Sequence, residues 1–314
     1  MRPHTIAALI LFCLLAAPAQ AADKLTVMLD WFVNPNHAAL VYAREQGFFK
    51  EEGLDVTLQQ PGDPNDPPKL AAAGSVDLAV SYQPQLHLQV AEGLPLRRVG
   101  VLVEQPLNTV MVLADSGITD LKQLKGKKIG FSVGGVEDAL LETMLSGAGL
   151  SLKDVTLVNV NFSLSAALLA GQVDAVIGAY RNFEAHQLEL KGKAGRYFAV
   201  EANGVPLYDE LIFVTNTKNV ADARLPRFFR ALNKATAALK KDSTAARAVF
   251  FAAYPETKDE LNTRAWADTV PLLASDTAAL DTARYEAFSA FMRQRGLVKS
   301  EQPVSALAVK VPLR

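Results

Sequence analysis

The chain has 314 residues, with 32 Lys plus Arg against 33 Asp plus Glu, and half of its residues are apolar. This length favours about two domains and allows a sizeable core. A net charge of −1 gives no sign of nucleic-acid or membrane-surface binding, and the composition argues against a wholly disordered chain. Because Cys13 is the one cysteine, disulfide scaffolds, thiolate metal sites and cysteine nucleophiles are excluded from the rest of the chain.

The first 21 residues have the pattern of an export signal. Arg2 gives a positive start, residues 6–17 form an apolar run too short to span a membrane, and Ala19-Gln20-Ala21 fits a cleavage site. Cys13 follows Phe12, where a lipoprotein signal needs a small residue. We therefore expect a periplasmic, unlipidated protein cut near Ala21. No later stretch is apolar enough to span a membrane, so the mature chain is expected to be soluble.

Two halves of the chain repeat the same order of elements. An apolar strand is expected at 25–29, a second in GLDVTL at 53–58 and a third in AAGSVDLAVSY at 72–82, with helical patterns between them. The order returns with a strand at 128–133, KDVTLVNV at 153–160 and LAGQVDAVIGAY at 169–180. In both final segments a Gly stops the helix before Val-Asp begins the strand. Each half therefore predicts a parallel sheet with helices on both faces.

The stretches that join the halves predict a hinge. The apolar runs within 99–113 and at 211–215 are candidates for two strands that cross between lobes. Four helical segments follow, at 225–240, 243–254, 258–273 and 277–296, and should pack on the first lobe. The predicted class is α/β, with two doubly wound sheets joined by a two-strand hinge. We expect one lobe at 23–108 plus 214–314 and the other at 109–213, with ligands at the carboxyl ends of the strands.

Polar and aromatic side chains gather where the predicted strands end. The loop 30–37 reads DWFVNPNH, SYQP at 81–84 ends one repeated strand, and AYRNFE at 179–184 ends the other. Any one of these aromatic residues is at least as typical of a core, and Glu184 also suits the start of a helix. The coincidence of three such loops instead favours a site for a flat, polar heterocycle, which rings stack against and amides and carboxylates hydrogen-bond. The turn at Gly134-Gly135 has two interpretations. It offers backbone N–H groups to an acceptor atom of a ligand, or it is an ordinary strand-to-helix turn.

The chain resembles the pyrimidine-precursor-binding proteins of thiamine salvage. The resemblance rests on these loops and on GFFKEEGLDV at 47–56, LKGKKIG at 124–130, GQVDAVIG at 171–178 and GVPLYDEL at 204–211. The resemblance covers nearly all of 24–240. It implies the type II periplasmic-binding-protein fold and an extracytoplasmic receptor that delivers formylaminopyrimidine or hydroxymethylpyrimidine to the permease subunits of an ATP-driven (ABC) importer. It also implies a monomer, with no catalytic residue, metal or cofactor.

The candidate ligand-binding residues follow from the loops and the resemblance together. Trp31 and one or more tyrosines are expected to sandwich the ring, while amide and carboxylate groups read its polar edge. The full set is Trp31, Asn36, His37, Tyr82, Gln83, Asn108, Tyr180, Asn182, Glu184 and Tyr208.

Two other functions stay open at this point. One is a receptor for a flavin-like heterocycle or a small sulfonate, although Arg181 is the one nearby cation that an anion would have. The other is an enzyme, because fungal hydroxymethylpyrimidine phosphate synthase resembles the same region. That enzyme uses an active-site His, pyridoxal phosphate on a lysine, and a cysteine-rich loop near iron. Gln85 and Ser81 stand at the His and lysine positions, and residues 14–314 contain no cysteine.

Overall fold

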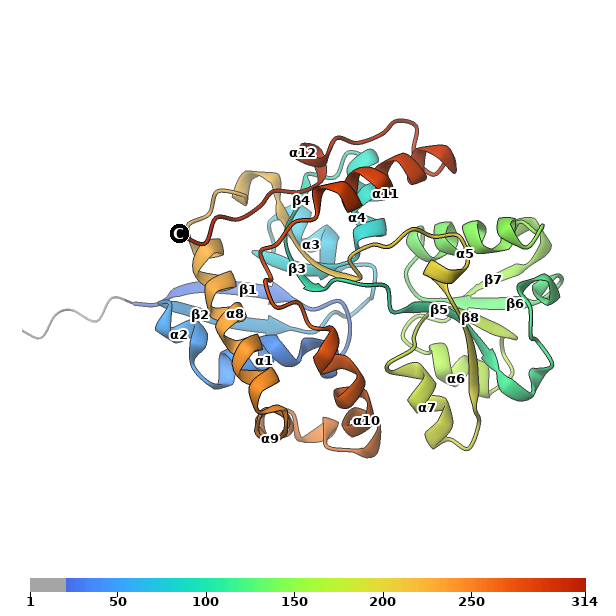
Figure 1. Ribbon diagram of the computed structural model, residues 1–314, viewed down its shortest axis with the longest axis horizontal. Coiled ribbons are helices and arrows are strands. Elements are labelled where there is room, and N and C mark those ends of the chain that lie inside the picture. The colour runs from blue at the N-terminus through green and yellow to red at the C-terminus, as the bar shows by residue number, and fades with distance from the viewer. Residues whose placement is uncertain (1–20) are drawn as a thin grey trace, which may run out of the picture.

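The structure, a computed structural model, describes residues 21–314. The predicted export signal, including Cys13, lies outside these residues except for Ala21. Figure 1 shows two lobes, each built on one sheet with helices around it. Among the described helices, none is both long and apolar enough to cross a membrane.

The first lobe contains a five-stranded sheet in the order β2-β1-β3-β10-β4. Strands β1, β2 and β3 run parallel, whereas β10 runs antiparallel to both of its neighbours. Strands β3, β4 and β10 are almost wholly buried, which agrees with their nearly continuous apolar sequences. The strands are β1 (Asp23–Met28), β2 (Leu54–Gln59), β3 (Leu78–Ser81), β4 (Leu96–Val103) and β10 (Leu211–Asn216).

The second lobe repeats this arrangement in the order β7-β6-β8-β5-β9. Strands β6, β7 and β8 run parallel, and β5 runs antiparallel to β8 and β9. The two Val-Asp segments therefore lead into strands of different sheets, β3 and β8, as the repeat predicts. The strands are β5 (Asn108–Leu113), β6 (Lys128–Phe131), β7 (Thr156–Asn159), β8 (Ala175–Tyr180) and β9 (Gly195–Ala199).

The helices cover both faces of each sheet. In the first lobe α8 and α9 pack on α1, and α11 and α12 pack on α4. Helix α10 differs from the prediction, because it contacts α7 of the second lobe as well as the first. The helices are α1 (Ala38–Glu45), α2 (Phe48–Glu51), α3 (Pro67–Ala73), α4 (Gln83–Ala91), α5 (Val136–Gly147), α6 (Leu164–Leu169), α7 (Glu184–Leu190), α8 (Arg224–Lys241), α9 (Ser243–Ala253), α10 (Glu260–Thr269), α11 (Thr282–Gln294) and α12 (Val304–Leu307).

The chain crosses between the sheets twice, at 104–107 after β4 and at 200–210 after β9. The antiparallel strand of each sheet, β5 or β10, is the one that follows a crossing. The crossing residues lie between strands and not within them. Strands β4 and β10 belong wholly to the first sheet, and β5 and β9 belong wholly to the second. The strands that follow the crossings, β5 and β10, begin at residues 108 and 211, within three residues of the predicted lobe starts at 109 and 214. The two lobes as domains stay a prediction.

The repeated Val-Asp motif has a structural reason. Asp77 accepts a hydrogen bond from the Thr26 N–H at 2.7 Å and donates its own N–H to the Thr26 carbonyl at 3.1 Å. Asp174 makes the same pair of bonds with Lys128, both at 2.8 Å. In each lobe the aspartate thus joins the last of the three parallel strands to the middle one of the three, β1 or β6, and sets their register.

We expect Asp77→Ala to lower the free energy of unfolding by about 1–2 kcal/mol, because the Thr26 N–H and the Arg224 guanidinium both lose a charged acceptor. Urea unfolding measures this loss. Asp55→Ala is the matched control, since Asp55 is exposed and its side chain makes no hydrogen bond in the described structure. Equal losses in the two variants would contradict this role for the motif.

Candidate functional site

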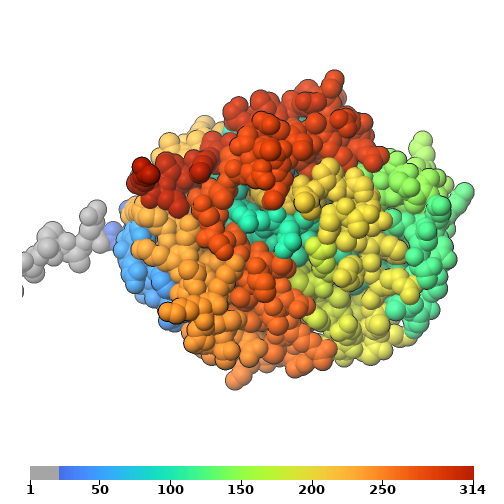
Figure 2. All heavy atoms as spheres, in the orientation of Figure 1, coloured from blue at the N-terminus to red at the C-terminus, as the bar shows by residue number. Residues whose placement is uncertain are grey.

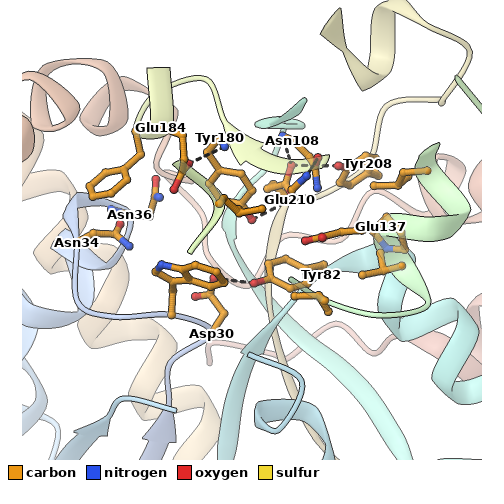
Figure 3. Close-up of a pocket in the computed structure, with 18 residues that line it drawn as sticks. Asp30, Asn34, Asn36, Tyr82, Asn108, Glu137, Tyr180, Glu184, Tyr208 and Glu210 are labelled. Carbon is orange, nitrogen blue, oxygen red and sulfur yellow. Dashed lines mark hydrogen bonds between the residues drawn. The ribbon is translucent and has the colours of Figure 1, made fainter. Parts of the chain in front are cut away.

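A pocket lies between the lobes at the carboxyl ends of the parallel strands, where α/β sheets typically bind ligands (Figure 3). The loops after β1 and β3 form one wall, and the turns after β6 and β8 form the other. The second crossing and the start of β5 complete the lining. The lining residues are Asp30, Trp31, Asn34, Asn36, Tyr82, Pro84, Asn108, Val133, Val136, Glu137, Leu140, Leu164, Gly178, Tyr180, Phe183, Glu184, Tyr208 and Glu210.

Contacts between the lobes enclose this pocket on more than one side. The Asn182 amide donates to Asn36 Oδ1 at 2.9 Å and to Thr269 Oγ1 of α10 at 2.8 Å. Elsewhere Trp31 of the first lobe packs edge-on against Phe162 of the second, with ring centroids 4.6 Å apart. In Figure 2 the α10 region, in orange, lies directly against the yellow-green surface of the second lobe. The lobes are therefore closed over the pocket.

The first lobe holds Asp30 in place with two donors. His37 Nδ1 accepts from the Asn34 N–H at 3.3 Å, so the ring proton is on Nε2, which donates to Asp30 Oδ1 at 2.9 Å. The Tyr82 hydroxyl donates to the other oxygen, Oδ2, at 3.0 Å. Both oxygens of this buried carboxylate are thus engaged by the protein itself.

The second lobe contributes two glutamates from the first turns of helices. Glu184 Oε2 accepts from the Tyr180 N–H, and Glu137 Oε2 accepts from the Ser132 N–H, each at 2.7 Å. Burial raises the pKa of Glu184 to about 7 and the pKa of Glu137 to about 8, although these backbone donors oppose the shift.

Glu210 joins the pocket to both crossings. Its Oε2 accepts from the Leu107 and Asn108 N–H groups, at 2.5 and 3.0 Å, and from the Tyr208 hydroxyl at 3.1 Å. Its Oε1 accepts from the Tyr180 hydroxyl at 3.2 Å. Burial raises the pKa of Glu210 to about 7, against the effect of these four donors. A carboxyl group on the second crossing thereby fixes the backbone of the first and orients two tyrosines.

The ionisable side chains of the lining include carboxyl groups but no basic group. Four carboxyl groups face the pocket, from Asp30, Glu137, Glu184 and Glu210, and none of its lining residues is Lys, Arg or His. Arg181, the cation noted in the sequence, does not line it. Its guanidinium instead pairs with Glu201 at 2.5 Å and donates to the Pro106 carbonyl. The pocket is therefore suited to hydrogen-bond donors and positive charge and unsuited to anions.

Seven of the predicted ligand-binding residues meet in this pocket, and three do not. His37 is fully buried and is occupied by Asp30 and Asn34. Gln83 lies behind the lining, where its Oε1 accepts from the Asp209 N–H at 2.8 Å. Asn182 bridges the lobes. The residues inside are Trp31, Asn36, Tyr82, Asn108, Tyr180, Glu184 and Tyr208, and their binding role stays a prediction.

Eleven lining residues are not among those predicted from the sequence. They are Asp30, Asn34, Pro84, Val133, Val136, Glu137, Leu140, Leu164, Gly178, Phe183 and Glu210. Asp30, Asn34 and Phe183 lie in loops that the sequence analysis had singled out, and Glu210 lies in the GVPLYDEL run. Glu137 follows the Gly134-Gly135 turn, for which the sequence analysis considered only the backbone N–H groups. Those N–H groups are in fact taken by Asn65 of the first lobe, at 3.0 Å, and by Asp138, at 3.2 Å. The signal that could have identified Glu137 is its place in the first turn of the helix that follows this turn.

Gly178 leaves the space that the carboxyl group of Glu137 occupies. Its φ of +97° is rarely adopted by other residues, and a Cβ there would lie 2.3 Å from Glu137 Oε1. We expect Gly178→Ala to lower the free energy of unfolding by roughly 2–4 kcal/mol in urea titrations. Gly171→Ala, at φ +66° but in open space, is the control and should lose about 1 kcal/mol. Similar losses would contradict the steric part of this account.

Stability should fall as pH rises from about 6.5 to 8. The folded protein holds protons on Glu137, Glu184 and Glu210 that the unfolded chain, with carboxyl pKa values near 4.5, has already released. Burial lowers the pKa of His87 from 6.5 to about 3, so this residue makes stability rise with pH. That opposing rise ends near pH 6.5, where His87 of the unfolded chain has also lost its proton. Urea unfolding at several pH values measures the decline, and Glu137→Gln should flatten it between pH 7 and 8. An unchanged slope in that variant would contradict the assignment.

Comparison with known proteins places the chain among thiamine-related proteins. The family described as NMT1/THI5 like matches residues 34–246. A Haemophilus influenzae protein named as a thiamine biosynthesis protein is 52% identical over 299 residues, covering 95% of each chain. The formylaminopyrimidine-binding protein of Halalkalibacterium halodurans is 39% identical over 221 residues, which are 70% of this chain and 67% of that one.

More distant matches include an enzyme and a sulfonate-binding structure. The 4-amino-5-hydroxymethyl-2-methylpyrimidine phosphate synthase of Aspergillus parasiticus is 36% identical over 159 residues, 50% of this chain and 46% of the enzyme. The alkanesulfonate-binding protein SsuA of Xanthomonas axonopodis, solved with MOPS bound, has a TM-score of 0.73 at 20% identity and covers 93% of this chain and 100% of its own. That structural likeness confirms the periplasmic-binding-protein fold predicted from the sequence. The chain belongs to the NMT1/THI5 like family.

Proposed function

We propose that this protein is an extracytoplasmic receptor that binds a pyrimidine precursor of thiamine and delivers it to an ABC importer. The observation that carries the proposal is the pocket itself, in which four carboxyl groups and several aromatic rings meet without a cationic side chain. An aminopyrimidine has N–H donors on a flat ring and no negative charge, so it matches this lining. The formylaminopyrimidine-binding relative, at 39% identity, supports the same ligand class.

The alternatives are less well supported. A small sulfonate is an anion, and the pocket has carboxyl groups where such a ligand needs cationic or N–H donors. For the synthase reaction, Ser81 and Gln85 stand at the positions of the enzyme's lysine and histidine. They bond to each other, with the Ser81 hydroxyl donating to Gln85 Oε1 at 3.0 Å, and neither lines the pocket. A flavin-like heterocycle shares the required donors and is tested directly below.

The proposal includes location and movement. A receptor of this kind would act outside the cytoplasmic membrane after removal of residues 1–21, as a monomer that docks on permease subunits. Its lobes, at 23–108 with 214–314 and at 109–213, would rotate about the two crossings as rigid bodies. The interlobe bonds of Asn182 would then form on closure.

Calorimetry with aminopyrimidines tests the site. Glu184→Gln keeps an oxygen for the Tyr180 N–H but removes the carboxyl group that ionises when the ligand donates to it. Such a charge-assisted bond is worth about 1.5–3 kcal/mol, so affinity should fall roughly tenfold or more. Trp31→Ala should cost at least as much through lost stacking and burial. Glu142→Gln, on the exposed face of α5, is the control.

Riboflavin and taurine serve as competing ligands, and Trp31 fluorescence in a Trp266→Phe background gives a second readout. Binding of riboflavin or taurine, with no binding of any aminopyrimidine, would overturn the proposed ligand. Unchanged affinity in both site variants would overturn the proposed site.

A further inference from the structure

The four carboxyl groups of the pocket differ in what their oxygens contact. Asp30 has both oxygens engaged, by His37 and Tyr82, and Glu210 has both engaged by the crossings and the tyrosines. Glu184 and Glu137 each have Oε2 fixed by one strand-end N–H. Among residues 21–314, no side chain donates to Oε1 of either glutamate. Within that part of the chain, these two oxygens are thus the carboxyl acceptors of the lining that have no side-chain donor, and we take them as acceptors for a ligand.

Glu137 and Glu184 are built in the same way. Each lies in the first turn of a helix that follows a parallel strand, α5 after β6 and α7 after β8, and those two strands are neighbours in the sheet. Each is fixed by a backbone N–H at or just after the end of its own strand. Figure 3 shows the two glutamates on opposite sides of Tyr180 and Glu210, with Glu137 pointing into the pocket from the side of α5.

The strand beside Glu137 leaves room for its carboxyl group. Gly178 of β8 has no side chain where Glu137 Oε1 lies, and its N–H is bound to Asn108 Oδ1 at 3.0 Å. Glu137 is 4% exposed, and its surroundings include the apolar side chains of Val133, Val136 and Leu140. A buried carboxyl group without a cation is costly to ionise, and such groups are concentrated at functional sites.

We propose that Glu137 is a second ligand-binding carboxyl group, and that the ligand has two separate hydrogen-bond donors, one for Glu184 and one for Glu137. The inference rests on the proposed function, because it takes the ligand to be an aminopyrimidine. The ring amino group then bonds to Glu184, and a donor on the neighbouring exocyclic substituent bonds to Glu137. The receptor thereby selects pyrimidines whose substituent carries an O–H or N–H over those with a plain alkyl group.

The test compares three probes that differ only in that substituent. They are 4-amino-2-methylpyrimidines with a 5-hydroxymethyl, a 5-aminomethyl or a 5-methyl group, measured by calorimetry against wild type, Glu137→Gln, Glu184→Gln and Glu142→Gln. In Glu137→Gln the amide oxygen still accepts from the Ser132 N–H, so the fold is retained, and thermal unfolding of each variant checks this.

Glu137→Gln should weaken the hydroxymethyl and aminomethyl probes at least fivefold and the 5-methyl probe less than twofold. Glu184→Gln should weaken all three, and Glu142→Gln none. An equal loss for all three probes in Glu137→Gln, or no loss, would overturn the inference while leaving the proposed function intact. Failure of wild type to bind any of the probes would overturn both.

Discussion

The carboxyl group of Glu210 is the interaction on which the architecture of the site depends. It lies on one crossing, accepts two backbone N–H bonds from the other, and faces the pocket. Its neighbour Asp209 turns the other way, pairing with Arg284 and receiving a contact from Arg98 at 3.8 Å in the first lobe. Two successive acidic residues thus fix the second crossing to the first lobe and to the first crossing. These contacts lie where the two crossings meet, beside the pocket.

Burial of several carboxyl groups in one pocket has a free-energy cost. Each is removed from water beside aromatic and apolar side chains, and burial raises the pKa of three of them to between about 7 and about 8. A ligand that donates hydrogen bonds or carries positive charge relieves this cost, whereas an anion increases it. The ligand proposed for this chain and that of the sulfonate-binding neighbour, whose TM-score is 0.73, thus have opposite charge preferences on the same fold. Selectivity in this account comes from charge on the lining loops, while the sheets determine only where those loops meet.

Much of the fold was predictable from the sequence, because the repeat has a local physical cause. Asp77 and Asp174 form equivalent bonds to the middle one of the three parallel strands in each sheet, β1 and β6, so the same motif recurs at the same place in both halves of the chain. Three of the missed lining residues, Asp30, Asn34 and Phe183, were adjacent to residues already identified. Glu137 and Glu210 were harder to predict, because what makes them site residues is a three-dimensional match: the space left by Gly178, and the approach of residues 107–108 to residue 210 across the sequence. His37 and Gln83 do not line the pocket, for a related reason. Polar side chains in a lining loop also have to satisfy that loop's own backbone, and these two do so.

The central claim is that the closed lobes hold a donor-rich aminopyrimidine. Native mass spectrometry of the protein purified from its own cell envelope tests this most directly, because it identifies the small molecule that travels with the chain. The account predicts a retained species whose mass and fragmentation are those of an aminopyrimidine without a phosphate or sulfonate group. Retention of a sulfonate, a phosphate ester or another anion at one molecule per chain would contradict it.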